Sequence, residues 1–454
     1  MPSDLEITLA TLQLWADDPS LIDAIPRAKT LVAKVHKQGN RAAKLGTRTE
    51  ERDRDRRKRE STGLVTAQAL PFDASALPAL NELQRLERGA TCAHCRARFF
   101  ELHPFYHSLC PSCAALNWTK RHQSADLNGR VALLTGGRIK IGFQCALKLL
   151  RDGARVIVTT RFAQDARRRF ERQSDFDSWR ERLEIHALDL RFLGEVEAFC
   201  AHLSASLAHL DIVIYNAAQT IKRPPAFYAH LLEGEVALFS HQLSLEHQED
   251  SAGFASSFNR ELERGEEDAN PALSRYFPPS QLDRDEQQLD LRPHNSWTQT
   301  LGEVDTLEAA QCYLVGALSP FVLAGHLRPL LKRSPNPRRF LVLSSAMEGN
   351  FSRASKTTRH PHTNMTKAAL NMLVRTSAPD LKLDGIWCNA VDTGWITDEN
   401  PHPTKERLRE NGFVPPLDSL DGAARLLDPI YRGLAEAEEP LCGHFLKDYE
   451  VHEW

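Results

Sequence analysis

Four cysteines in two close pairs are the first residues whose spacing predicts a chemistry. The pairs are "CAHC", with Cys92 and Cys95, and "CPSC", with Cys110 and Cys113, and fourteen residues separate them. Four thiolates from two such knuckles can close a tetrahedral zinc site that leaves no open position for a substrate. We therefore predict a small structural zinc module over residues 89–124.

A glycine-rich turn is the second feature with a chemical meaning. The short apolar stretch "RVALLTGG" leads into this turn, the amphipathic stretch "GFQCALKLLRDGA" follows it, and "RVIVTTR" comes next. The pattern predicts a strand, a turn, a helix and a second strand. Glycines allow backbone N–H groups to approach a pyrophosphate, and a helix N-terminus favours negative charge. Gly136, Gly137 and Gly142 fit this role in a dinucleotide-binding unit.

Further apolar segments must complete the fold that positions these residues. "LEIHALDL", "LDIVIYNAA" and "RRFLVLSSA" are expected strands, and helical segments lie between them. This alternation predicts an α/β fold, a doubly wound parallel sheet of the Rossmann-like kind, over residues 125–454. Residues 1–88 form a predicted helical N-terminal region, since Leu5, Leu9, Leu12, Ile22 and Ile25 have helix-like spacings.

Composition narrows the class of protein. The chain has 454 residues, is 42% hydrophobic and 26% charged, and carries a net charge of -3. This charge does not favour nucleic-acid binding. The sequence contains no run of about 18 apolar residues, so no transmembrane helix is predicted. The clustered cysteines favour a metal site in a reducing compartment over a disulfide scaffold, so we expect a cytoplasmic location.

Several motifs, in the expected order, resemble those of the short-chain dehydrogenase/reductase family from about Leu127 onward. "TGGRIKIG" resembles its glycine turn, "LDL" its adenine-contacting motif, and "NAA" its Asn-Ala-Gly motif. "LVLSSA" resembles the strand that ends in the catalytic serine. "NAVDTGWIT" resembles the segment that follows the catalytic helix, with Thr393 in place of a proline.

The resemblance implies a set of cofactor-binding residues. Lys140 replaces the middle glycine of the family's turn, as a basic residue does in the family's pteridine reductases. The cofactor residues implied are Gly136, Gly137, Arg138, Lys140, Ile141, Gly142, Arg161, Asp189, Leu190, Asn216, Ala217, Lys367, Gly394 and Thr397.

The residue after the second strand predicts which cofactor is used. An NAD enzyme usually has an acid there for the ribose hydroxyls, whereas Arg161 occupies this position. A guanidinium matches a 2′-phosphate, and Arg138 and Lys140 add positive charge in the turn. We therefore expect NADP(H) rather than NAD(H).

The family's catalytic residues are only partly present. Ser345, or else Ser344, matches its serine, and Lys367 matches its lysine, which would bind the nicotinamide ribose. Gly316 stands at the position of the family's asparagine, and Thr363 at the position of its tyrosine. These two departures leave the proton donor to be identified.

Three residues are candidates for that donor. Thr363 can donate a hydrogen bond, but an aliphatic hydroxyl is far less acidic than a phenol. His360 lies seven residues before Lys367, about two helical turns, and so faces the same way, whereas His362 is expected to point away. An imidazole is a capable acid near neutral pH. The sequence leaves open whether Thr363, a histidine or neither serves.

An acidic insertion, residues 224–305, separates the family's motifs and is predicted to lie beside the nucleotide site as a lid or partner surface.

The main hypothesis is an atypical NADP-dependent oxidoreductase for a small carbonyl, alcohol or pterin-like substrate. The alternative is a catalytically degenerate NADP(H)-binding scaffold or sensor that acts through the zinc module and the insertion. A homo-oligomer and a protein partner remain open for either.

Overall fold

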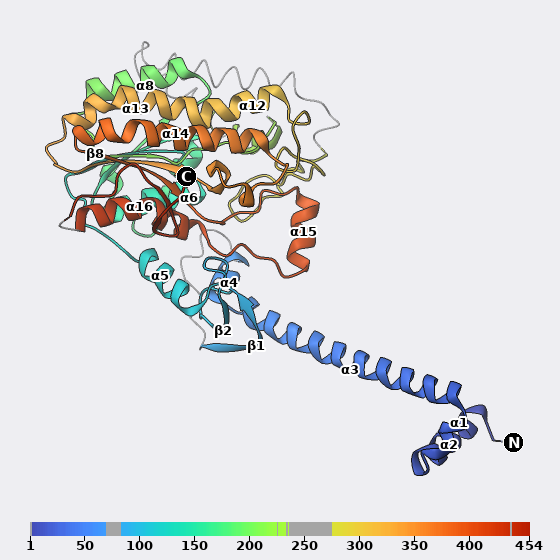
Figure 1. Ribbon diagram of the computed structural model, residues 1–454. Coiled ribbons are helices and arrows are strands. Elements are labelled where there is room, and N and C mark those ends of the chain that lie inside the picture. The colour runs from blue at the N-terminus through green and yellow to red at the C-terminus, as the bar shows by residue number, and fades with distance from the viewer. Residues whose placement is uncertain (1, 70–82, 225, 233–234, 236–274, 436–437) are drawn as a thin grey trace.

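The computed structural model describes residues 2–69, 83–224, 226–232, 235, 275–435 and 438–454. It has three parts: an N-terminal arm of helices, a small module with a two-stranded sheet, and a large α/β domain (Figure 1). This confirms the predicted α/β class with a helical N-terminal region.

The N-terminal region consists of helices, with α1 (Asp4–Asp17), α2 (Ser20–Asp23), α3 (Pro26–Glu60) and α4 (Gly63–Ala69) in sequence. A capping box starts α1, because the Ser3 hydroxyl accepts a bond from the Glu6 N–H while the Glu6 carboxylate accepts one from the Ser3 N–H. Pro26 lies in the first turn of α3, where its missing N–H costs nothing.

The cysteine-containing module pairs β1 (Gln84–Thr91) with β2 (Arg98–Leu102) in antiparallel fashion and adds α5 (Pro111–Arg121). Strand β1 begins five residues before the predicted boundary at residue 89, because Gln84 already pairs with Leu102. Its small core is made of buried apolar residues: Leu64, Leu86, Phe99, Leu102, Phe105, Tyr106 and Leu109.

The large domain is built on one eight-stranded sheet in the order β10-β9-β8-β7-β6-β3-β4-β5. All neighbours are parallel except β9 and β10. The reversal of order around β3 is the switch point of a doubly wound fold. The strands are β3 (Val131–Thr135), β4 (Arg155–Thr160), β5 (Leu183–Ala187), β6 (Ile212–Tyr215), β7 (Arg339–Ser345), β8 (Ile386–Asp392), β9 (Phe445–Lys447) and β10 (Glu450–His452).

Helices cover both faces of the sheet, as Figure 1 shows. On one face lie α8 (Leu193–Ser206), α12 (Thr306–Tyr313), α13 (Ser319–Lys332) and α14 (Pro361–Leu383). On the other lie α6 (Lys140–Arg151), α7 (Ala163–Glu171) and α16 (Ser419–Ala435). Each face has its own apolar core, so every central strand is buried on both sides, as a parallel sheet requires.

Short helical segments join these elements: η1 (Phe176–Ser178), η2 (Arg180–Arg182), η4 (Met347–Gly349), η5 (Arg353–Ser355) and the separate helix α15 (His402–Glu410). A π-helical turn, η3 (Leu314–Leu318), connects α12 to α13. Among the described residues, one helical segment, Thr306–Lys332, reaches the length and mean hydropathy of a membrane span, although the sequence predicted none. Half of its most apolar window is buried, and α13 packs against α8 as a core helix does.

The described part of the insertion lies against the nucleotide half of the sheet. The Glu235 carboxylate accepts bonds from the Gln164 and Asp165 N–H groups at the N-terminus of α7. Glu286 forms a two-fold ion pair with Arg172, at 2.9 Å for each bond. The acidic stretch "LERGEED" lies outside the described residues, so its predicted role as a surface stays a prediction.

The cysteine module is attached to the large domain through buried charges. Arg121 of α5 pairs with Asp418 at 2.7 Å and with Asp421 at 3.0 Å. The Tyr106 hydroxyl also donates to Asp421, at 2.7 Å. Since these groups are mostly buried, removal of one partner would leave an unpaired charge inside the protein.

Candidate active site

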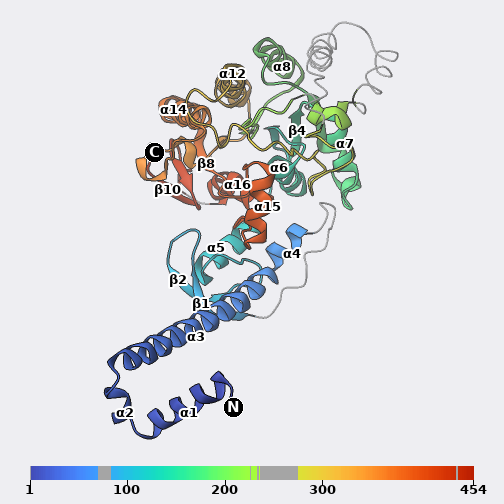
Figure 2. The same cartoon turned by 90° about the vertical axis from the view of Figure 1, so that its right-hand side faces the viewer.

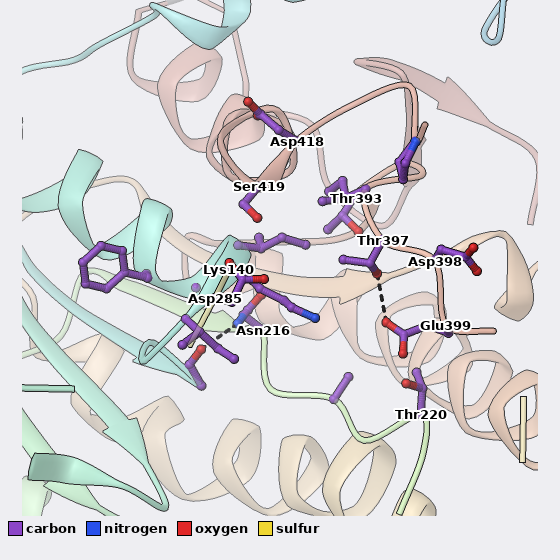
Figure 3. A pocket seen from close by; sticks show the side chains of 18 of the residues that line it. Lys140, Asn216, Thr220, Asp285, Thr393, Thr397, Asp398, Glu399, Asp418 and Ser419 are labelled. Carbon is purple, nitrogen blue, oxygen red and sulfur yellow. Dashed lines mark hydrogen bonds between the residues drawn. The ribbon is translucent and has the colours of Figure 1, made fainter. Parts of the chain in front are cut away.

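A cleft of about 1970 Å³ opens at the carboxyl ends of the central strands. Its walls come from the glycine turn, the insertion, α15 and the first knuckle of the cysteine module, and Figure 3 shows a pocket within this region from close by. Ligands of doubly wound sheets bind in this crevice, where the strand order reverses. The cleft is therefore the candidate active site.

The glycine turn has the backbone that a phosphate-binding turn needs. Gly136 has a φ of 72°, and a Cβ at Gly142 would lie 2.1 Å from the Gly136 carbonyl oxygen, so a larger residue does not fit there. Lys140 has a φ of 53°, the left-handed conformation that glycine adopts freely. The lysine therefore keeps the shape of the family's turn at some conformational cost.

Gly137 plays a different part from the one predicted. It is absent from the cleft lining, and a Cβ there would lie 2.5 Å from a methyl group of Val158 on β4. Its small size therefore allows the turn to pack on the second strand rather than to approach a phosphate. Ile141 and Gly142 do line the cleft.

The end of β6 holds the glycine turn in place. The Asn216 amide donates to the Gly136 carbonyl at 3.0 Å, and the Ala217 N–H donates to the Thr135 hydroxyl at 3.1 Å. Figure 3 shows Lys140 and Asn216 among the residues that line the pocket. The two segments predicted to bind the cofactor are thus brought together.

The insertion engages both arginines predicted to recognise a 2′-phosphate. Arg138 is buried and donates to Asp165 at 2.6 Å and to Gln287 at 2.7 Å. Arg161 donates to the Tyr228 hydroxyl at 2.9 Å, and its guanidinium lies 4.7 Å from the centre of the Tyr228 ring. Both line the cleft, and Arg161 also acts by its charge on Asp189.

Asp189 and Leu190 lie in the cleft wall at the end of β5, as predicted. Burial opposes ionisation of Asp189, but the neighbouring Arg191 and Arg161 outweigh it and hold the pKa of this carboxyl below its usual value. Asp189 is bonded to Arg191 Nε at 3.0 Å.

Ser345 and Lys367 come together at the inner end of the cleft. The Ser345 hydroxyl donates to Asn371 at 2.5 Å, and the Lys367 ammonium donates to the Ser344 carbonyl at 2.8 Å. Burial lowers the pKa of Lys367, while the charges of Glu348, Cys312 and Asp392 act in the opposite direction. Thr363 also lines the cleft and is 2% exposed.

His360, which helical spacing predicted to face the same way as Lys367, does not line the cleft. His360 occupies the N-cap position of α14 with a left-handed backbone. Its ring stacks on the ring of Trp297 in the insertion, with the two ring centroids 4.0 Å apart and the ring planes 9° from parallel. Its Nδ1 lies 2.9 Å from the Trp297 carbonyl oxygen. His362, expected to point away, has its Nε2 3.3 Å from the Thr363 hydroxyl. Neither histidine lines the cleft.

The position of the family's asparagine has no room for one. Gly316 lies in the π-helical turn, and a Cβ there would meet a methyl group of Thr366 at 2.4 Å. The buried Cys312, one turn earlier, donates its thiol to the Gln219 carbonyl at 2.8 Å. An asparagine relay is therefore excluded at this position without a rearrangement of α14.

Two acids near Ser345 and Lys367 escaped the sequence prediction. Asp392 ends β8 directly across from Ser345 in the strand register, and Glu348 lies in the short helix after β7. Burial raises the pKa of Asp392 to about 6, and the charges of Glu348 and Asp448 act in the same direction. The signal available in the sequence was an acid, Asp392, inside the motif "NAVDTGWIT".

The segment after β8 completes the cleft. Gly394 has a φ of 82°, and Thr397 donates its hydroxyl to Glu399 at 2.9 Å, a bond drawn in Figure 3. Burial alone would raise the pKa of Glu399, but the nearby Lys140, Lys405 and Arg223 lower it. Lys405, from α15, also lines the cleft.

The four predicted metal ligands form one cluster. The sulfur atoms of Cys92, Cys95, Cys110 and Cys113 all lie within 4.8 Å of one another. The Cys95 and Cys110 sulfurs are 3.6 Å apart, close to the spacing of about 3.8 Å that Zn–S bonds of about 2.3 Å give in a tetrahedron. The residues present therefore fit a four-thiolate metal site.

Comparison with known proteins shows which family the large domain resembles. Residues 130–231 match the short chain dehydrogenase family. C-signal of Myxococcus xanthus is 30% identical over 130 residues, 29% of this chain and 72% of that protein. Dehydrogenase/reductase SDR family member 13 of Bos taurus is 40% identical over 97 residues, 20% of this chain and 24% of that protein.

A longer match is to the uncharacterized protein R665 of Acanthamoeba polyphaga mimivirus, which is 29% identical over 358 residues, 75% of this chain and 71% of that protein. With the sheet order and the glycine turn, these matches show that the chain belongs to the short-chain dehydrogenase/reductase family, a family of oxidoreductases.

Proposed function

We propose that this protein is an NADP(H)-dependent oxidoreductase of a small carbonyl, alcohol or pterin-like substrate, and that its four cysteines hold a structural zinc ion. The observation that carries the proposal is the glycine turn, in which only a glycine fits at position 142 and Lys140 keeps a glycine-like backbone. A turn of this shape presents N–H groups to a pyrophosphate. The clustering of four cysteines in one group favours a metal site in a reducing compartment such as the cytoplasm.

The primary test is a fluorescence titration of the full chain with NADPH and with NADH. NADPH should bind and quench tryptophan emission in a saturable way. Lack of binding to either nucleotide would contradict the proposal. Turnover of carbonyl and pterin substrates is then measured with whichever nucleotide the protein binds.

Arg161 is the residue that should distinguish the two cofactors. Arg161→Ala is expected to weaken NADPH binding by about 10- to 100-fold, since a charge-assisted bond contributes about 1.5–3 kcal/mol, and to leave NADH binding nearly unchanged. Arg155→Ala, at the exposed start of the same strand, is the matched control, because Arg155 pairs with Glu184 away from the cleft. Equal losses for both nucleotides would refute this role.

Asp392 is the group that we propose as proton donor in place of the absent tyrosine. The cofactor would supply the hydride, and the nascent alkoxide would take the proton from the Asp392 carboxyl beside Ser345. Lys367, placed by the Ser344 carbonyl, would bind the nicotinamide ribose, and Thr363 would orient the substrate by a hydrogen bond. A carboxyl with a pKa near 6 suits general acid chemistry better than an aliphatic hydroxyl.

The raised pKa of Asp392 makes a prediction about stability and pH. The folded protein holds this proton more tightly than the unfolded chain, so stability is lost as the pH rises from 3.8 to about 6. Asp392→Asn is therefore expected to raise the free energy of unfolding at pH 8 by up to roughly 3 kcal/mol and to change little at pH 3.5. Urea unfolding at both pH values checks this.

The exposed Asp177, 91% accessible at its side chain, provides the control for that measurement. Asp177→Asn should change stability little at either pH. An Asp392→Asn variant that is less stable than the wild type at pH 8 would show that the buried carboxylate is the favoured form, and Asp392 would not be the donor.

A second candidate function is an NADP(H)-binding scaffold or sensor without turnover. It is favoured by one observation, the close approach of Thr366 to Gly316, which leaves no space for the family's relay asparagine. NADPH binding without its oxidation by any of the carbonyl or pterin substrates would support this function over the first.

A further inference from the structure

The N-terminal arm, defined here as residues 2–48, exposes apolar side chains along its whole length. It projects away from the rest of the molecule, with α1 and α2 at the far end of α3 (Figures 1 and 2). No side chain of α1 or α2 is buried, and Asp55 is the only buried residue of α3. The exposed apolar residues are Leu5, Ile7, Leu9, Leu12, Leu14, Leu21, Ile25, Leu31, Val32, Val35 and Leu45.

The arm exposes more apolar side chains than we expect for a segment that contacts only water. Helix α1 has 14 residues, a length at which an isolated helix is marginal in water, and none of its side chains is buried in the described chain. Its apolar residues point to all sides, the pattern of a helix that is buried. On α3, Leu31, Val35 and Leu45 lie on one side of the helix at turn-like spacings. Many exposed apolar side chains on one arm indicate an interaction surface.

Charge is divided sharply along the same arm. Residues 4–23 contain five acids, namely Asp4, Glu6, Asp17, Asp18 and Asp23, and no lysine or arginine. Residues 27–48 contain seven basic residues, namely Arg27, Lys29, Lys34, Lys37, Arg41, Lys44 and Arg48, and no acid. One half of the arm is therefore complementary in charge to the other half.

We propose that the arm is a self-association surface, in which α1 and α2 of one copy lie along the basic half of α3 of a second copy. Such a contact is isologous, because each copy offers the same two surfaces to the other, and it closes into a dimer. Helix α1 is short enough to lie along this surface, because its 14 residues span about 21 Å and residues 26–48 span about 34 Å at 1.5 Å per residue. A nucleic acid or an anionic membrane would be repelled by the acidic half.

The proposal is tested by exchange of charge between two variants of the full chain. The first is Asp17→Lys with Asp18→Lys, where lysines at the end of α1 also suit the helix dipole. The second is Lys34→Glu with Lys37→Glu, which keeps good helix formers on α3. Each variant alone opposes like charges, whereas a mixture of the two restores opposite charges at both contacts.

Sedimentation velocity and light scattering should give twice the chain mass of 51.1 kDa for the wild type, at least tenfold weaker association for each variant alone, and a restored dimer for the mixture. High salt should weaken the wild-type dimer. Leu9→Asp should also dissociate it, whereas Leu383→Asp, at an 85% exposed residue on α14, should not.

Three results would overturn the proposal. A monomeric wild type would mean that the arm folds on its own chain or binds another partner. Pelleting of a monomer with phosphatidylserine vesicles would assign the arm to a lipid surface. A dimer that survives both charge variants would place the contact elsewhere. Circular dichroism of each variant shows whether its helices are retained, and the restored dimer in the mixture excludes misfolding as the cause.

Discussion

Replacement of Cys92 by serine is expected to remove the bound metal and to unfold the cysteine module. The wild-type protein should contain about one zinc ion per chain by elemental analysis, and Cys92→Ser should contain close to none. Structural zinc sites of this type contribute about 10–16 kcal/mol of binding free energy to folding. Cys92 is fully buried, so the serine would also leave a polar hydroxyl in the core of the module.

The loss should extend beyond the module. Arg121 and Tyr106 bond to Asp418 and Asp421 of the large domain, so an unfolded module leaves these carboxylates without partners. A thermal melt of Cys92→Ser should therefore show a lower midpoint for the large domain as well. Cys442→Ser, at a half-buried cysteine outside the cluster, is the control and should keep its zinc. Wild-type protein without zinc would exclude the metal site.

A single methyl group at Gly142 is expected to abolish NADPH binding. The added Cβ would lie 2.1 Å from the Gly136 carbonyl oxygen and 2.5 Å from the Asn216 amide nitrogen, so the turn must open. Overpacking of this kind costs about 1–3 kcal/mol in stability, and the displaced N–H groups would no longer converge on a phosphate. Fluorescence titration should show at least a 100-fold weaker affinity for Gly142→Ala.

Gly194→Ala provides the matched control. Gly194 also lies in the first turn of a helix, α8, and a Cβ there would meet nothing within 4 Å. This variant should bind NADPH as the wild type does and be slightly more stable, since alanine is the better helix former. If Gly142→Ala binds NADPH with the wild-type affinity, the turn is not the pyrophosphate site.

The parallel sheet and the glycine turn could be predicted because their causes are local. Apolar runs such as Val131–Thr135 and Arg155–Thr160 are strands in any context that buries both faces of a sheet. The cysteine cluster is similarly local, since two knuckles constrain the chain around one point.

The proton donor could not be predicted, because its surroundings come from distant parts of the chain. Helical spacing predicted that His360 faces the same way as Lys367. Trp297 of the insertion, 63 residues earlier, instead stacks on its ring, and His360 does not line the cleft. Asp392 was passed over because only the pairing of β7 with β8 places it beside Ser345. Burial then sets its pKa, and burial is a property of the whole fold.

Residue order and periodicity were thus sufficient for the class of fold, the glycine turn and the cysteine cluster, and the motifs carried the resemblance to the family. The contacts of Arg138, Arg161 and His360 with the insertion, the packing of Thr366 on Gly316 and the acid beside Ser345 depended on which segments meet in space. The physical reason is the distance along the sequence over which each interaction acts. Backbone conformation and apolar spacing act over a few residues, whereas burial, charge pairing and steric exclusion act between residues that can be a hundred or more positions apart.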